Sequence, residues 1–137
     1  GHMIINPAGP EHFRGFPGVV ENYISGGGLE SLFKDENQSE CSLSDITQKF
    51  RNNEQPYLDF FNKFIHNFGT SMANLINVLD PDIIVLGGGV SNIDELYTLG
   101  IKEVQKQFTD PLQENIIVKN KLGDSAGVIG AALVASP

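Results

Sequence analysis

An apolar run from Ile83 to Leu86 leads directly into three consecutive glycines, Gly87, Gly88 and Gly89. A continuous β-branched run of this kind is typical of a strand that is covered on both faces, as in a parallel sheet. Glycines at the end of such a strand permit positive φ angles and let the backbone approach a ligand closely. Ligands of open α/β sheets bind at these strand ends, where consecutive free N–H groups can hold an anion. The spacing alone fits a ligand-binding turn and a plain strand-to-helix turn equally well.

The residues before this strand predict a long amphipathic helix with one buried face. Pro56 suits its first turn, and Asp80 with Pro81 closes it. Its apolar residues recur at intervals of three and four: Leu58, Phe61, Ile65, Phe68, Met72, Leu75 and Leu79.

Shorter elements are predicted on either side of this long helix and the strand that follows it. Ser42, with Asp45 three residues further on, resembles an imperfect capping box and indicates a helix over 42–50. The other expected elements are strands over 3–6 and 116–119, helices over 19–24 (ended by Gly26 to Gly28), 93–108 and 125–135, and a surface loop over 34–41. This order predicts one α/β domain over residues 1–137, with right-handed crossovers between parallel strands.

Composition excludes several classes of function. The chain has 137 residues, of which 40% are hydrophobic and 19% charged, as is usual for a folded globular domain. Its net charge of -8 disfavours nonspecific binding to nucleic acid or to an anionic membrane, because no basic patch is present to neutralise phosphates. No apolar run approaches the length of a membrane span, and no amino-terminal segment resembles a signal peptide. Cys41 is the single cysteine, which excludes an intramolecular disulfide and predicts a reducing, cytoplasmic location.

Three segments resemble motifs of the ROK family (repressors, open reading frames, kinases), and together they span nearly the whole chain. Residues 79–91 resemble its adenosine-binding stretch, residues 1–11 resemble the start of its sugar-site and zinc motif, and residues 124–132 resemble its closing helix. Members of this family are sugar kinases and sugar-responsive regulators. The resemblance implies an α/β fold of the actin-like ATPase (ribonuclease-H-like) type, of which this chain would form the carboxyl-terminal lobe with part of the sheet absent.

The resemblance also implies roles for individual residues. Gly87 to Gly89 would line the adenosine pocket of ATP. Glu21 falls where the family has a sugar-binding glutamate, whose carboxylate would accept hydrogen bonds from sugar hydroxyls; without the resemblance, a solvated position on a surface helix is the better interpretation. His2 would match a histidine near the sugar and the zinc, although residues 1–3 are also the tripeptide that a cleaved purification tag leaves behind.

The zinc motif is where this sequence departs from the family. The family pattern is Cys-x-Cys-Gly-x-x-Gly-Cys-x-Glu, whereas residues 12–21 place His12, Arg14 and Val19 at the three cysteine positions. A structural zinc needs four ligands of the Cys or His type, and arginine and valine cannot coordinate a metal. His2 and His12 supply two ligands at best, so the sequence predicts that zinc is absent.

The functional expectation follows from what the chain contains. The catalytic aspartate and the two phosphate loops of the family are not found within residues 1–137, so no catalytic residue is assigned. The chain is therefore expected to be the sugar- and adenosine-binding portion of an ATP-dependent kinase of a hexose or N-acetylhexosamine, unable to transfer phosphate by itself. In the complete enzyme, ATP with Mg²⁺ would be the cofactor. A sugar-sensing domain of a ROK-type transcriptional regulator and a degenerate, inactive product remain as alternatives. Because a partial sheet exposes an edge and apolar surface, a homo-oligomer is expected.

Overall fold

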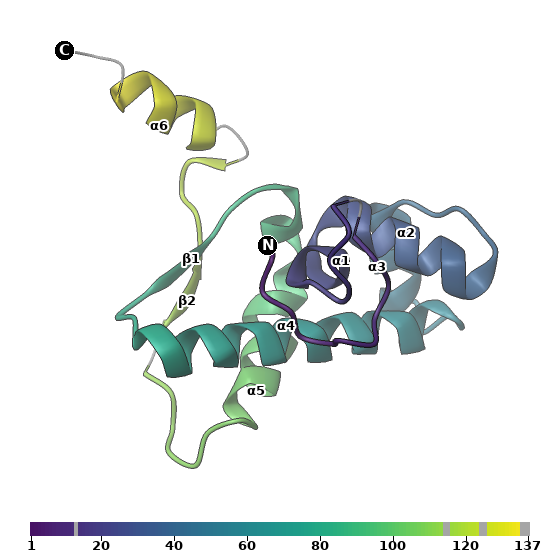
Figure 1. Cartoon of the computed structure of the whole chain (residues 1–137), viewed down its shortest axis with the longest axis horizontal. Helices are drawn as coiled ribbons and strands as arrows, with labels where there is room; N and C mark the ends of the chain where they lie inside the picture. Colours follow the sequence, from purple (N-terminus) through teal and green to yellow (C-terminus); the bar gives the residue numbers. More distant parts are fainter. Residues whose placement is uncertain (13, 114–115, 124–125, 135–137) are drawn as a thin grey trace.

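The computed structural model describes residues 1–12, 14–113, 116–123 and 126–134, which form a mixed helical and stranded domain (Figure 1). The elements in chain order are α1 (Val20–Ile24), α2 (Gly26–Asn37), α3 (Leu43–Arg51), α4 (Tyr57–Leu79), β1 (Ile84–Leu86), the 3-10 helices η1 (Gly89–Asn92) and η2 (Asp94–Tyr97), α5 (Leu99–Gln105), β2 (Ile117–Lys119) and α6 (Ala126–Val134). No helix among these residues is both long and apolar enough to cross a membrane.

The long helix α4 is the centre of the core, as its periodicity predicts. Its apolar face buries a row of phenylalanines, and α1, α3 and α5 all pack against it. Phe61 is fully buried, stacked on Phe50 of α3 at 4.0 Å between ring centroids. A side chain at Gly100 of α5 would press on the ring of Phe68, so the glycine lets α5 approach α4 closely. The core therefore lies on the helical side of the molecule (Figure 1).

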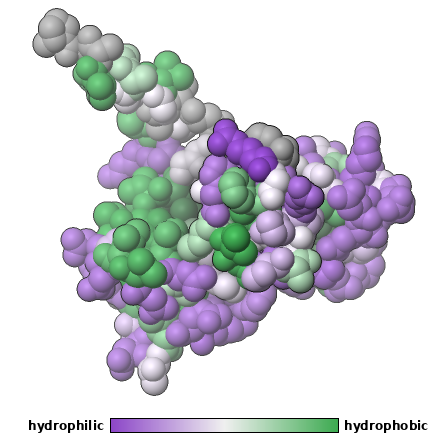
Figure 2. Space-filling view, in the orientation of Figure 1, coloured by the Kyte–Doolittle hydropathy of each residue, from purple (hydrophilic) through white to green (hydrophobic). Residues whose placement is uncertain are grey.

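The two strands pair in parallel, with Ile84 opposite Ile117 and Leu86 opposite Lys119. The segment from η1 to α5 connects them, which confirms the predicted order of strand, helix and parallel strand. The expected burial of the first strand on both faces is wrong within the described part of the chain, because Val85 is 58% exposed. Figure 2 shows an apolar area over the strands and the nearby end of α4, and α6 projects away from the body in Figure 1.

Four other expectations need correction. Gly26 to Gly28 does not end a helix but begins α2, because the Ser25 hydroxyl accepts the Gly28 N–H at 3.0 Å and caps the new helix. The expected loop over 34–41 is helical as far as Asn37. The expected helix over 93–108 is divided into η2 and α5, and the strand expected over 3–6 is a single bridge between Ile4 and Val19. The predicted N-cap at Ser42 is confirmed: its hydroxyl accepts the Asp45 N–H at 3.1 Å.

Candidate functional site

The amino-terminal segment lies antiparallel to the start of α1. The Val20 N–H donates to the Met3 carbonyl at 2.8 Å, and the Glu21 N–H donates to the Gly1 carbonyl at 3.0 Å. Gly18 makes the turn that permits this pairing: its φ is 59°, and its carbonyl accepts the Ile5 N–H at 3.0 Å. The pairing places residue 2 directly beside residue 21.

Two histidine rings therefore face one carboxylate. Nε2 of His2 lies 3.8 Å from Oε2 of Glu21, and Nε2 of His12 lies 3.6 Å from the same oxygen. The His12 side chain is only 4% exposed, whereas His2 and Glu21 are about half exposed at 49% and 42%. The structure thus brings together the two predicted sugar ligands, His2 and Glu21, and adds the buried His12 beside both.

A polar cavity of about 470 Å³ lies next to this group, and we call it the sugar-side cavity. Carboxylate, amide, hydroxyl and imidazole groups line it, a mixture that suits a ligand rich in hydroxyl groups. Its lining residues are Glu11, His12, Glu21, Asn22, Ser25, Gly27, Gly28 and Ser31.

A second cavity of about 740 Å³ lies on the other side of α2, between α3 and η1, and we call it the glycine-side cavity. Gly89 lines it, whereas Gly87 lines a separate small hollow of about 110 Å³. A side chain added at Gly87, Gly88 or Gly89 would meet no atom within 4 Å, so this turn is open rather than sealed by packing. Only Gly88, with φ at 77°, needs glycine for its backbone conformation.

The amino end of α2 separates the two cavities. Gly26 lines the glycine-side cavity, and Gly27 and Gly28 line the sugar-side cavity. Free N–H groups and the positive end of the helix dipole make such a helix start favourable for an anionic group. The sequence prediction missed this feature because it interpreted the three glycines as a helix stop.

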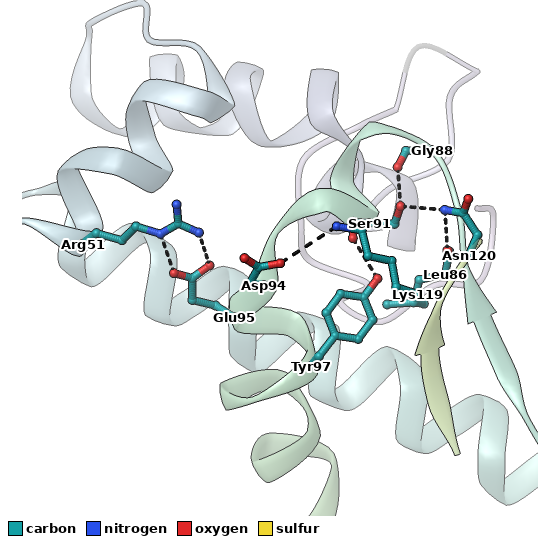
Figure 3. Close-up of polar contacts among 9 residues, drawn as sticks. All are labelled: Arg51, Leu86, Gly88, Ser91, Asp94, Glu95, Tyr97, Lys119 and Asn120. Carbon is teal, nitrogen blue, oxygen red and sulfur yellow. Dashed lines mark hydrogen bonds and ion pairs between the residues drawn. The ribbon is translucent and has the colours of Figure 1, made fainter. Parts of the chain in front are cut away.

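Polar contacts hold the open glycine turn in place (Figure 3). The Ser91 hydroxyl donates to the Gly88 carbonyl at 2.7 Å, and the Tyr97 hydroxyl donates to the Ser91 carbonyl at 2.8 Å. Burial raises the pKa of Tyr97, which keeps this hydroxyl protonated as a donor. The Asn120 amide donates to the Leu86 carbonyl at 3.1 Å and to Ser91 Oγ at 3.2 Å. Asn120 belongs to none of the sequence motifs. Its position directly after the second strand is the one sequence signal that places it at this edge of the sheet.

Arg51, which lines the glycine-side cavity, forms an ion pair with Glu95 (Figure 3). Arg51 at the end of α3 donates to Glu95 through Nε at 2.6 Å and Nη2 at 2.9 Å. This two-fold contact with Arg51 lowers the pKa of the Glu95 carboxyl. The pair links α3, one wall of the cavity, to η2, which directly follows η1 in the chain.

The lowered pKa of Glu95 predicts a pH dependence of stability. The ion pair contributes fully to the free energy of unfolding at pH values above the pKa of a glutamate in the unfolded chain, which is ~4.3. This contribution is lost as the pH falls through the lower pKa of Glu95 in the folded state. Because Arg51 is half exposed, we expect Arg51→Gln to lower the free energy of unfolding by only about 1 kcal/mol at pH 7. At pH 3 the loss should be much smaller. Urea unfolding at both pH values measures it, and an equal loss at both would contradict the assignment.

Comparison with known proteins places the chain in a family. The sequence matches the model of the ROK family over residues 1–137. It is 39% identical over 113 residues to an N-acetyl-D-glucosamine kinase from Mannheimia succiniciproducens, and 41% identical over 113 residues to a kinase of the same name from Pasteurella multocida. Each alignment covers 82% of this chain and 37% of the kinase, so the chain spans little more than a third of the length of these curated relatives.

Solved structures show the same fold. The ROK hexokinase from Thermus thermophilus superimposes with a TM-score of 0.85 and 25% identity, over 98% of this chain and 46% of the hexokinase. A ROK glucokinase from Streptomyces griseus, in complex with glucose and AMPPNP, has a TM-score of 0.74 and 24% identity, over 98% of this chain and 50% of the glucokinase. A ROK family transcriptional regulator is similar in fold as well, with a TM-score of 0.74 and 24% identity. This match covers 98% of this chain and 37% of the regulator. With the parallel strands and the strand-end glycine turn described above, these matches show that the chain belongs to the ROK family and forms part of an actin-like ATPase fold.

Proposed function

We propose that this chain forms the sugar- and adenosine-binding portion of an ATP-dependent sugar kinase. The observation that carries the proposal is the placement of two cavities on either side of the amino end of α2. Such an arrangement suits a reaction in which a sugar hydroxyl and a nucleotide phosphate must meet. A kinase is favoured over a transcriptional regulator because the curated relatives at 39% and 41% identity are kinases.

In this proposal the sugar binds in the sugar-side cavity. The Glu21 carboxylate accepts hydrogen bonds from two ring hydroxyls, and His2 contributes a ring nitrogen beside it. Hydrogen bonds to a charged group are worth about 1.5–3 kcal/mol each, so one carboxylate can contribute much of the specificity for a polyol. The names of the curated relatives make N-acetyl-D-glucosamine the first sugar to test.

The adenosine of ATP binds in the glycine-side cavity. The open backbone of Gly87 to Gly89 would lie along the nucleoside, while Val90 and Leu43 supply apolar contact and Thr47 a hydroxyl. The phosphates would then extend toward the amino end of α2, whose N–H groups favour negative charge. Mg²⁺ would accompany the phosphates in the complete enzyme, and no described residue is assigned to hold it.

Phosphate transfer itself needs a base for the sugar hydroxyl and groups that neutralise the γ-phosphate. No residue of either cavity is assigned to those tasks. We therefore propose that the 137-residue chain binds both ligands but does not turn them over. We also propose that it self-associates through the exposed apolar area around Ile83 and Val85.

A binding titration tests this function. We expect the chain to bind N-acetyl-D-glucosamine, and Glu21→Gln to weaken that binding by about tenfold or more, because a charged acceptor is lost. Binding of a non-hydrolysable ATP analogue should be unchanged, and a coupled assay with ATP should detect no turnover. Isothermal titration calorimetry measures both affinities.

Glu40→Gln is the matched control, because Glu40 is an exposed carboxylate paired with Lys34 outside both cavities. Equal sugar affinity in the Glu21 variant would remove Glu21 from the site, and measurable turnover would overturn the proposed inactivity.

A further inference from the structure

The zinc motif of the family does not fit the residues of this chain. Two of its ligand positions are occupied by Arg14 and Val19, and Val19 is completely buried in its bridge with Ile4. Neither side chain can coordinate a metal, so the four-ligand structural site cannot form. The groups left near this place are His2, His12 and Glu21, whose potential donor atoms lie within 4.8 Å of one another. These three side chains require an explanation of their own.

The backbone determines which nitrogen of His12 carries the proton. The Arg14 N–H donates to Nδ1 of His12 at 3.3 Å, so Nδ1 is an acceptor and carries no hydrogen. A neutral imidazole then carries its proton on Nε2, the nitrogen that lies 3.6 Å from Oε2 of Glu21. A metal at Nε2 would require the opposite arrangement, with the proton on Nδ1 as a donor. That proton would point directly at the Arg14 N–H, so the loop disfavours a metal on His12.

We propose that His12 is a positioning residue that directs its Nε2–H at the Glu21 carboxylate and thereby orients this carboxylate without a metal. This inference rests on the proposed sugar site. His12 is held firmly: its N–H donates to the Phe16 carbonyl at 2.9 Å, and its own carbonyl accepts the Gly15 N–H at 2.7 Å. The 3.6 Å contact is longer than a direct hydrogen bond, and a rotation of the half-exposed Glu21 side chain would close it.

The arrangement also distinguishes the two oxygens of Glu21. Both histidines approach Oε2, His2 at 3.8 Å and His12 at 3.6 Å. The rings lie edge to face, with centroids 5.6 Å apart, so each restricts the orientation of the other. In this arrangement Oε1, which has two lone pairs, accepts the two sugar hydroxyls. Orientation before binding raises affinity because less side-chain entropy is lost when the ligand arrives.

Three variants of the full 137-residue chain test this role. The side-chain amide of His12→Gln reaches about as far as Nε2, whereas that of His12→Asn reaches only as far as Nδ1, and His12→Ala removes both. We expect His12→Gln to bind N-acetyl-D-glucosamine within about threefold of the wild type, and the other two variants to bind about tenfold more weakly. A purely structural role would not be rescued by Gln and lost with Asn. Equal affinities in all four proteins would overturn the proposal.

Nuclear magnetic resonance provides a readout that does not depend on sugar binding. Long-range ¹H–¹⁵N correlations should show His12 as the Nε2–H tautomer, and the Glu21 carboxyl ¹³C shift should change in His12→Ala but not in His12→Gln. If the wild type binds no sugar while these signatures hold, the sugar proposal fails and the positioning contact stands. An Nδ1–H tautomer overturns the positioning role. A stoichiometric shift of both histidine rings on adding Zn²⁺ would likewise overturn it, in favour of a metal held by His2, His12 and Glu21.

Discussion

Gly18→Ala should release the amino-terminal segment from α1 and abolish sugar binding. Gly18 has φ at 59°, a conformation that costs an alanine about 1 kcal/mol, and its new Cβ would overlap the backbone carbonyl of Asn6. Asn6 cannot move away without breaking the bonds that Ile5 and Asn6 donate to the Gly18 carbonyl. Together, strain and overlap should lower the free energy of opening this segment by about 3 kcal/mol.

Hydrogen exchange measures this opening locally. The Ile5, Val20 and Glu21 amides all donate across the pairing, and we expect their protection to fall about 100-fold. Amides in the middle of α4 should keep theirs, because the core cluster does not include the amino-terminal segment. Gly15→Ala is the matched control: its φ is 81°, but its Cβ would meet only the Glu11 side chain at 3.7 Å. If both variants lose protection equally, backbone strain rather than the close approach to Asn6 is responsible.

Gly28→Ala should destabilise the junction of α1 and α2 and displace Glu21. A Cβ at Gly28 would overlap the Glu21 carbonyl and lie 2.6 Å from the Asn22 carbonyl. Backbone atoms cannot rotate away, so the two helices must separate. We expect the free energy of unfolding to fall by about 2–3 kcal/mol, as for other overpacked sites. Sugar affinity should fall with it, because the main chain that carries Glu21 must move.

The neighbouring glycine provides the control for this change. A Cβ at Gly27 would meet no atom within 4 Å, although Gly27 lies one residue earlier in the same helix turn. Gly27→Ala should therefore leave thermal stability unchanged or slightly higher, since alanine favours the helix by up to about 1 kcal/mol. Thermal unfolding of the two variants, followed by circular dichroism, makes the comparison. A similar loss in both would contradict the close packing of Gly28 on α1.

Some elements of the fold were predictable because they depend on close neighbours in the sequence. The three- and four-residue spacing of apolar side chains predicted α4 over nearly its exact length. Ser42 and Asp45 predicted the start of α3, since a helix cap needs only residues three apart. The β-branched runs predicted both strands and their parallel pairing.

Other elements were not predictable from local pattern. The glycines at 26–28 resemble a helix stop, but the α1 carbonyls lie so close to α2 that residue 28 must be glycine, and the Ser25 cap starts the helix there. The apolar run of β1 predicted burial on both faces, yet Val85 is exposed, because burial depends on what packs against a strand. An apolar run shows that a strand favours burial, but it does not show whether another element packs against each of its faces.

The same division holds for the site. Residue types and the resemblance of motifs were sufficient to propose Glu21, His2 and the glycines of the turn as candidate site residues, since a motif depends only on residues that are close in the sequence. The approach of two histidines to a single oxygen of Glu21 came from the antiparallel pairing of segments many residues apart. The tautomer of His12 came from the three-dimensional conformation of its own loop, which places the Arg14 N–H on Nδ1. The two cavities on either side of α2 required α1, α3 and η1 to pack around one helix end. Distances between remote segments are set by the packing of the whole chain, and short-range periodicity contains no information about them.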